Sequence, residues 1–107
     1  MSSSPMTEAM YYVLLALCKP NHGYGLMQEI DRLSAGRMAM GPGTLYGLLR
    51  RLEQEGLITL LEDDGRRKSY VITETGKEAL FHEYRRLKRL LLDGAFLADW
   101  LETEESP

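Results

Sequence analysis

Residues 41–56 read GPGTLYGLLRRLEQEG, and this stretch decides the fold that we predict for the chain. Four of its leucines recur at the i, i+3, i+4 and i+7 positions of a half-buried helix. They are Leu45, Leu48, Leu49 and Leu52. Pro42 suits the first turn, where its missing N–H costs nothing, and Gly56 suits the left-handed position after the last turn. We therefore predict a helix that opens in residues 41–44, ends at Glu55 and keeps one face exposed.

Two helices are predicted before this stretch. Ser4 and Pro5 have the pattern of an N-cap followed by proline at the first helical position, and a helix over residues 6–17 follows. Residues 19–23 break it, and a second helix covers residues 24–33. The side chains predicted to face inward are Met10, Val13, Leu14 and Leu17, then Leu26, Met27, Ile30 and Leu33. Residues 37–40 are predicted to be a short extended segment.

Two β-prone runs come after it, residues 57–62 and residues 68–73, on either side of the sequence DDGRR. An Asp-Gly turn between such runs predicts a β-hairpin. Three helices followed by a two-stranded hairpin is the order of a winged helix-turn-helix. The predicted fold class is therefore mainly α, an α+β winged helix-turn-helix, with a DNA-binding domain over residues 1–74.

Residues 75–107 are predicted to be a long C-terminal dimerisation helix with an acidic tail. Thr73 or Thr75 caps this helix, which continues to about Leu101, longer than a small domain needs for its own core. Its apolar residues alternate spacings of four and three, as in a heptad seam. The seam consists of Leu80, Tyr84, Leu87, Leu91, Gly94, Ala98 and Leu101, and a second stripe of Leu90, Leu97 and Trp100 widens it. Because such a surface is an aggregation hazard in a monomer, we predict a homodimer, with packing onto the chain's own domain as the alternative.

The charge distribution permits a nucleic-acid partner without indicating one. The formal net charge is −3, but residues 93–107 contain five acids and no Lys or Arg, so residues 1–92 carry −3 + 5 = +2. Basic residues cluster at positions 50–51, 66–68 and 85–89. Since salt screens charges beyond roughly 8–10 Å, the local potential matters more than the sum.

The exposed face of the helix over residues 41–55 and the hairpin tip form the candidate DNA-binding surface. An α-helix fits the major groove of B-DNA, and a basic tip suits a phosphate run or the minor groove. The candidate residues are Thr44, Tyr46, Gly47, Arg50 and Arg51 of the helix and Arg66, Arg67 and Lys68 of the tip. Gly47 removes a side chain, which would let the helix approach the groove floor. The alternative is a solvated face on which Arg50 and Arg51 pair with residues 53–55.

Several stretches resemble the PadR family of transcriptional regulators. They are HGYGL at residues 22–26, GTLYGLLRRLE at residues 43–53, EGLI at residues 55–58, and RRKSYVIT at residues 66–73 followed by Gly76 and Lys77. The likeness runs in order over residues 7–80, and the string at residues 43–46 is its most specific part. The last helix is similar to the dimerisation segment of the compact branch, which has one long C-terminal helix.

The resemblance implies a homodimeric repressor that binds a pseudo-palindromic operator in double-stranded DNA and is released by a small molecule or another signal. By position, Thr44, Tyr46 and Arg50 would lie on the recognition helix and residues 66–68 on the wing. Family members commonly carry proline or another residue where this chain has Gly47, a departure that bears on the detailed base contacts. The compact branch is known for effector pockets at the dimer interface. Trp100 is most simply an anchor of the dimer interface, and the alternative is an effector site with Phe96 and Trp100 as candidate walls.

The sequence gives little support for other classes of function. His22 and His82 lie in different predicted elements without a spaced partner, so we predict no metal and no cofactor. The glycines at 41 and 43 lack a Walker-type lysine, and we predict no enzyme. Cys18 is the only cysteine, so no internal disulfide is expected. No apolar run approaches the roughly 20 residues that span a bilayer, and the first residues do not have the pattern of a secretory signal. We therefore predict a cytoplasmic protein without a membrane partner. A winged helix that binds protein and not DNA is the alternative function.

Overall fold

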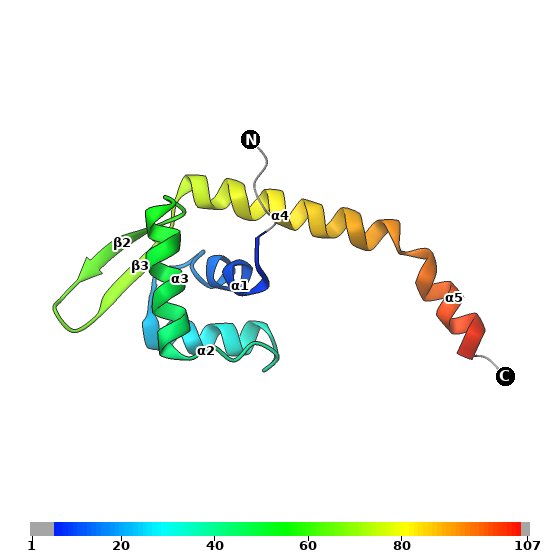
Figure 1. Ribbon diagram of the computed structural model, residues 1–107, viewed down its shortest axis with the longest axis horizontal. Coiled ribbons are helices and arrows are strands. Elements are labelled where there is room, and N and C mark those ends of the chain that lie inside the picture. Colours follow the sequence, from blue (N-terminus) through cyan, green and yellow to red (C-terminus); the bar gives the residue numbers. More distant parts are fainter. Residues whose placement is uncertain (1–5, 106–107) are drawn as a thin grey trace.

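The computed structural model describes residues 6–105 and has the element order of a winged helix-turn-helix extended by two C-terminal helices (Figure 1). The elements are α1 (Glu8–Ala16), β1 (Asn21–His22), α2 (Gly23–Leu33), α3 (Pro42–Gln54), β2 (Ile58–Asp63), β3 (Lys68–Ile72), α4 (Glu74–Asp93) and α5 (Phe96–Glu105). The predicted fold class is confirmed. Gly41 precedes α3, Pro42 occupies its first turn and Gly56 adopts a left-handed φ of 77°, as the sequence predicts.

The core lies where α1, α2, α3, the hairpin and the first half of α4 meet. All four inward residues predicted for the first helix are buried, as are Leu45, Leu49 and Leu52 of α3, while Leu48 is partly buried. In α2 the prediction holds for Leu26 and Ile30 and partly for Met27, but Leu33 is 36% exposed. Leu33 is the last residue of its helix, and the pattern of spacing alone does not reveal that the core ends one turn earlier.

The sheet has three antiparallel strands in the order β1-β3-β2. Asn21 pairs with Tyr70, Ile58 pairs with Ile72, and a bulge interrupts β2 between Leu60 and Glu62. The strand β1 lies where the sequence predicts only a break between helices. Residues 37–40, predicted to be extended, contain no strand, although Met38 and Met40 pack against the core.

Threonine side chains cap two of the helices. Thr7 caps α1 by accepting a hydrogen bond from the Met10 N–H at 3.1 Å, and Ser4 and Pro5, predicted to start this helix, lie outside the described residues. Thr73 caps α4: its hydroxyl accepts from the Gly76 N–H at 3.0 Å and donates to the Gly56 carbonyl at 2.6 Å. Thr73 thereby joins the end of α3, the hairpin and the start of α4.

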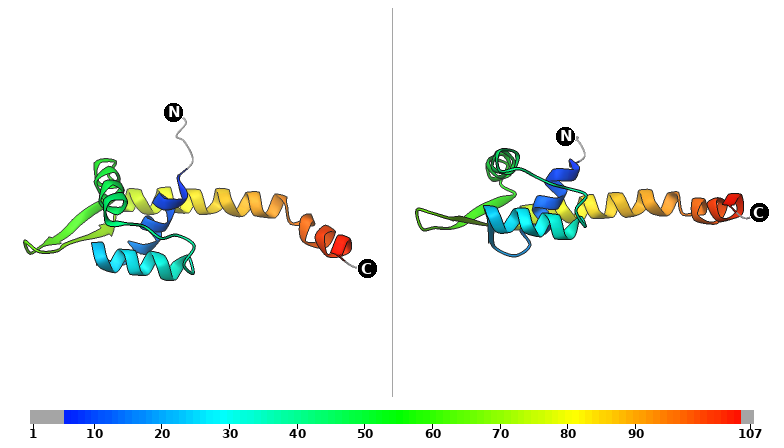
Figure 2. Two further views of the ribbon diagram at one scale, coloured as in Figure 1. Left: turned by 60° about the horizontal axis from the view of Figure 1, so that its bottom comes forward. Right: turned by 90° about the horizontal axis from the view of Figure 1, so that it is seen from below.

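The single helix predicted to reach about Leu101 is wrong, because α4 ends at Asp93 and α5 leaves in a new direction after Gly94 and Ala95 (Figures 1 and 2). Glycine has a low helix propensity, and the Ala95 N–H bonds to the Leu92 carbonyl in a tightened last turn. The two helices project from the core as a bent rod. The radius of gyration is consequently 16.9 Å, against about 13 Å for a compact chain of this length.

Candidate nucleic-acid interface

The helix α3 and the hairpin share one hollow of about 690 Å³. Five of the eight predicted DNA-binding residues line it: Tyr46 and Arg50 from α3, and Arg66, Arg67 and Lys68 from the tip between β2 and β3. All five are exposed to solvent. The fold thus brings together cationic side chains that are 16 to 18 residues apart in the sequence, on one concave surface.

The other three predicted residues lie outside this hollow. Thr44 is exposed in the first turn of α3, and Gly47 is partly buried. Arg51 donates from Nε to the Glu55 carboxylate at 3.0 Å, one turn further along α3. The solvated, paired arrangement that the sequence left open for both arginines is therefore found for Arg51, whereas Arg50 lies in the hollow.

The start of α2 also lines the hollow, and the sequence did not assign it a role there. His22, Gly23 and Tyr24 reach it because β1 pairs with β3 and so carries the start of α2 to the hairpin. The His22 ring caps α2, with its Nδ1 accepting from the Gly25 N–H at 3.4 Å. The sequence HGYG at residues 22–25 was the signal that could have pointed to this part of the site. Its most exposed large side chain is Tyr24, which is 65% exposed and so accessible to a ligand.

Two tyrosines, Tyr46 and Tyr70, line the hollow. The Tyr46 ring lies against Gly23, with Cζ 2.9 Å from where a Cβ at that position would stand. Tyr70 of β3 is buried, and burial raises the pKa of its hydroxyl, helped by the nearby carboxylates of Glu53 and Asp63. A tyrosine hydroxyl is already protonated at neutral pH, and the raised pKa of Tyr70 keeps it so in more alkaline solution.

Two aspartates shape the wing tip. Asp63 accepts from the Gly65 N–H at 2.9 Å, and Asp64 accepts from the N–H groups of Arg66 and Arg67 at 2.9 and 2.7 Å. These backbone bonds hold the pKa of the Asp64 carboxyl below its usual range. Gly65 supplies the left-handed φ of 86° that the turn requires. The two acids order the tip that carries the three basic side chains, and residues 63–68 retain a formal charge of +1 because three cations face two anions.

The C-terminal rod presents a second, apolar surface. Of the predicted seam, Tyr84, Leu87, Leu91, Ala98 and Leu101 are exposed, but Leu80 is only 8% exposed because it packs into the domain's own core. The seam prediction is wrong at Leu80, since helical spacing does not show which partner covers a residue. A groove of about 340 Å³ runs beside α4, lined by Tyr11, Tyr84, Leu87, Lys88, Leu91 and Leu92.

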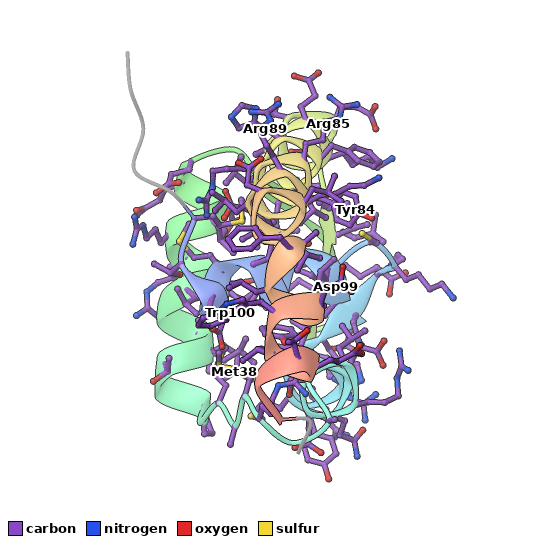
Figure 3. The ribbon with its side chains drawn as sticks, turned by 90° about the vertical axis from the view of Figure 1, so that its right-hand side faces the viewer. Met38, Tyr84, Arg85, Arg89, Asp99 and Trp100 are labelled. Atoms are coloured by element: carbon purple, nitrogen blue, oxygen red, sulfur yellow. The ribbon has the colours of Figure 1, made fainter. Side chains whose placement is uncertain are left out.

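The candidate effector residues are both exposed on α5, Phe96 by 66% and Trp100 by 56%. In the view along the rod from its α5 end, Trp100 and Asp99 point to opposite sides of α5, and Asp99 shares its side with Tyr84 (Figure 3). Arg85 and Arg89 point away from the body of the domain in the same view. Within residues 6–105, no three His, Cys, Asp or Glu side chains gather as a metal site would require, and no helix there is long and apolar enough to cross a membrane.

The fold and its basic hollow define a winged helix-turn-helix protein. Residues 13–82 match the Transcriptional regulator PadR-like family, and the chain belongs to that family, which is one of regulators and not of enzymes. The resemblance seen in the sequence is confirmed.

Two curated relatives show how far the sequence likeness extends. Transcriptional regulator YqjI of Escherichia coli is 37% identical over 60 residues, which cover 56% of this chain and 29% of YqjI. An uncharacterized 37.1 kDa protein of a Streptomyces fradiae transposon is 40% identical over 84 residues, 78% of this chain and 24% of that protein. The chain thus spans less than a third of the length of these relatives.

Two solved structures show the same arrangement. A PadR family regulator from Eggerthella lenta is 34% identical with a TM-score of 0.64, covering 89% of this chain and 82% of that one. Bacillus subtilis PadR in complex with operator DNA is 25% identical with a TM-score of 0.60, covering 69% of this chain and 46% of that one.

Proposed function

We propose that this protein is a sequence-specific DNA-binding repressor that acts as a homodimer on a pseudo-palindromic operator and is released by a small molecule or another signal. Residues 1–74 would bind DNA and residues 75–107 would dimerise. A regulator of this kind acts where the DNA is, so we expect it in the cytoplasm. The observation that carries the proposal is the shared hollow of α3 and the wing tip.

The shape and charge of the hollow suit a DNA backbone. A recognition helix enters the major groove while a wing reaches toward the neighbouring minor groove, so the phosphates between the two grooves pass between helix and wing. Here that path is bordered by Arg50 on one side and by residues 66–68 on the other. The operator DNA bound by Bacillus subtilis PadR supports carrying this mode of binding over to the present chain.

The test is a gel-shift titration against the DNA upstream of the protein's own gene, at two salt concentrations, with Arg50→Ala and a matched Arg51→Ala. Arg50→Ala should weaken specific binding by about 1–3 kcal/mol if Arg50 contacts a base edge with both guanidinium nitrogens. Arg51→Ala should bind much as the parent does, because Arg51 is held by Glu55 outside the hollow. Equal binding by parent and Arg50→Ala would reject Arg50 as a reader of DNA, and a parent that binds no DNA would favour the protein-interaction alternative.

The dimer is supported by the exposed apolar side chains of the rod, among which Leu91 is 74% exposed and Leu87 39% exposed. Leu91→Lys should give a monomer or an insoluble chain with little operator affinity, because a buried unpaired charge is costly and two half-sites must be held about one turn of DNA apart. Leu33→Lys, at an exposed leucine of α2, is the control and should still sediment as a dimer. A Leu91→Lys variant that stays dimeric would show that the interface lies elsewhere.

An effector site is proposed at Phe96 and Trp100, whose exposed rings offer flat apolar surface on α5. Trp100 is the sole tryptophan of the chain, so its fluorescence reports on this place alone. Planar cationic aromatic compounds should quench it in a saturable way, and the response should vanish in a Trp100→Ala variant followed by the compound's own fluorescence. If no such compound quenches Trp100, the ring serves only for packing.

A further inference from the structure

The hollow between α3 and the wing is lined by two kinds of side chain, cationic and aromatic. The cationic residues are Arg50, Arg66, Arg67 and Lys68, and the tyrosines are Tyr24, Tyr46 and Tyr70. Among the described residues that line the hollow, Asp63 is the one acid, so four cations against one carboxylate leave a formal charge of +3. Its volume of about 690 Å³ lies within the range of roughly 300–1,000 Å³ that small-molecule sites have.

The aromatic side chains lie at the end of the hollow formed by the start of α2. The Tyr46 ring lies against Gly23, and Tyr24 is the next residue along the chain, so both exposed tyrosines are close to one glycine. His22, just before Gly23, pairs with Ser69 of β3. The basic tip comes directly before Ser69, and the three residues from Ser69 back to Arg66 span at most about 10 Å. Ring faces and cations are therefore within reach of one small molecule.

A DNA duplex would use the cations of this hollow but not the faces of its rings. In a duplex each base is stacked between its neighbours, so a protein meets phosphates and base edges. A tyrosine hydroxyl can donate to a phosphate, but that contact needs the oxygen alone. An unpaired base offers its π-face, and proteins bind such bases by combining aromatic rings with a positively charged surface for the phosphates. The lining thus has the chemistry of a site for an unpaired nucleotide.

We infer that this hollow, proposed above as the DNA-binding surface, also binds a free nucleoside triphosphate. The base stacks on Tyr24 and Tyr46, and the phosphates bind residues 66–68 and Arg50, whose clustered charges suit several phosphates in a row. Because operator DNA would use the same cations, the nucleotide competes with DNA and lowers repression as its concentration rises. This regulation rests on the proposed function, whereas the binding of the nucleotide does not.

The first test measures ligand binding by the protein without DNA. Equilibrium dialysis with ATP, inorganic triphosphate and adenosine, at constant ionic strength and without divalent cations, separates the contribution of the base from that of the phosphates. ATP should bind on the order of tenfold more tightly than inorganic triphosphate, because stacking of the base adds to the attraction between charges. Adenosine should also bind more weakly than ATP. Equal affinities for ATP and inorganic triphosphate would overturn the inference, since the hollow would then attract phosphates alone.

The second test locates the base. Tyr24→Phe keeps the ring face without the hydroxyl and should bind ATP as the parent does, whereas Tyr24→Leu should bind ATP several-fold more weakly and inorganic triphosphate as before. Circular dichroism should show both variants folded, because Tyr24 is an exposed side chain. If Tyr24→Phe loses as much affinity for ATP as Tyr24→Leu does, the hydroxyl and not the ring makes the contact, and stacking is overturned.

The phosphates have a matched pair of variants of their own. Arg67→Ala should weaken the binding of both ATP and inorganic triphosphate, because Arg67 lines the hollow. Arg51→Ala should change neither, because Arg51 is paired with Glu55 outside the hollow. Equal losses in the two variants would overturn the placement of the phosphates at the wing tip.

The third test concerns regulation and uses a fluorescent operator fragment. At constant ionic strength ATP should displace the fragment at a lower concentration than inorganic triphosphate does, and Tyr24→Leu should reduce this difference. A parent that binds the fragment but releases it equally to both compounds would overturn the regulation and leave the proposed function standing. A parent that binds no DNA would overturn the proposed function, and the dialysis would still decide nucleotide binding. A short single-stranded oligonucleotide that binds where ATP does not would assign the rings to a strand and overturn the inference.

Discussion

The phenol of Tyr46 lies against Gly23 so closely that a Cβ on residue 23 would overlap the hydroxyl oxygen. Tyr46 belongs to α3 and Gly23 opens α2, so the missing side chain sets how near the two helices of the helix-turn-helix can approach. The contact also holds the Tyr46 ring, 47% exposed, in the hollow between α3 and the wing.

Gly23→Ala should therefore displace the Tyr46 ring and weaken operator binding several-fold, in the range of about 1 kcal/mol for a misplaced contact. The fold should persist, because the crowded atoms belong to the free end of a side chain. Gly43→Ala is the matched control, as no atom lies within 4 Å of its added Cβ. The measurement is a fluorescence-anisotropy titration with circular dichroism of each variant. Parental affinity in Gly23→Ala would show that the ring's position does not matter for DNA.

The wing tip should contribute affinity without sequence preference. Replacing Arg66 and Arg67 by alanine should weaken binding to all DNA sequences and reduce the slope of log K against log salt by about one unit for each phosphate that the tip no longer neutralises. Arg32→Ala, which removes an exposed arginine paired with Glu29 on α2, should leave that slope as it is. An unchanged slope in the wing variant would contradict a phosphate role for the tip.

The Glu83–Arg86 pair should make the stability of the fold depend on pH. Glu83 is 5% exposed, and the Arg86 guanidinium at 2.6 Å holds the pKa of its carboxyl below the usual range, although burial acts the other way. A carboxyl whose pKa is lower in the folded chain than in the unfolded chain adds stability above the unfolded pKa and loses it as pH falls through the folded value. The free energy of unfolding should thus fall more steeply between about pH 5 and pH 3 in the parent than in Glu83→Gln.

Urea titrations at several pH values measure this difference. Glu29→Gln removes a pair of the same spacing and length, Glu29–Arg32 at 2.6 Å, on a more exposed part of α2. It should change the pH dependence less, because exposed pairs contribute little. Identical pH profiles for the parent and Glu83→Gln would show that this carboxyl titrates alike in both states.

Two glycines should respond to alanine in opposite directions. At Gly76 the added Cβ would overlap the Leu57 carbonyl oxygen and come within 2.7 Å of Ile72, so Gly76→Ala should lower the free energy of unfolding by about 1–3 kcal/mol. At Gly47, inside α3, the added Cβ would meet only the end of the Arg50 side chain, at 3.9 Å. Gly47→Ala should therefore raise the free energy of unfolding by roughly 0.5–1 kcal/mol, because alanine favours the helix more than glycine does. Thermal and urea denaturation of the two variants and the parent measure both changes in the free energy of unfolding. If Gly47→Ala also keeps full operator affinity, the bare backbone there does not serve close approach to the groove floor.

The sequence predicts α3 and the hairpin well because their signals are local. The leucine spacing, Pro42 and Gly56 mark α3, and the Asp-Gly turn marks the hairpin. By contrast, β1 consists of two residues that become a strand only by pairing with β3. Two residues are too few to show an alternation of apolar and polar side chains, so the sequence does not predict this strand. The same pairing brings Tyr24 to the hollow, which is why the sequence located the basic residues of the site but not this neighbour.

The errors in the last helix have a different cause. The heptad spacing runs through Gly94 without interruption, since side-chain periodicity does not register that the backbone turns there. Spacing also treats Leu80 and Leu87 alike, although α1 and the core cover the first and leave the second 39% exposed. Periodicity identifies an apolar face, and only the tertiary structure shows what covers each part of it.

Thr73 has a consequence for how a signal could travel through the molecule. Its one hydroxyl binds both Gly56, just beyond the C-cap of α3, and the first turn of the long α4, and its N–H donates to the Leu57 carbonyl at 3.0 Å. In the proposed dimer, Thr73 would thus help to fix the DNA-binding domain to α4, the helix that also packs into the core through Leu80. If the chain dimerises as proposed, a rotation of one α4 relative to the α4 of the partner would change the distance between the two DNA-binding domains without bending either helix. The two half-sites of an operator lie a fixed distance apart along the DNA. A small rotation at the far end of α4 would therefore be enough to prevent both DNA-binding domains from fitting their half-sites at once.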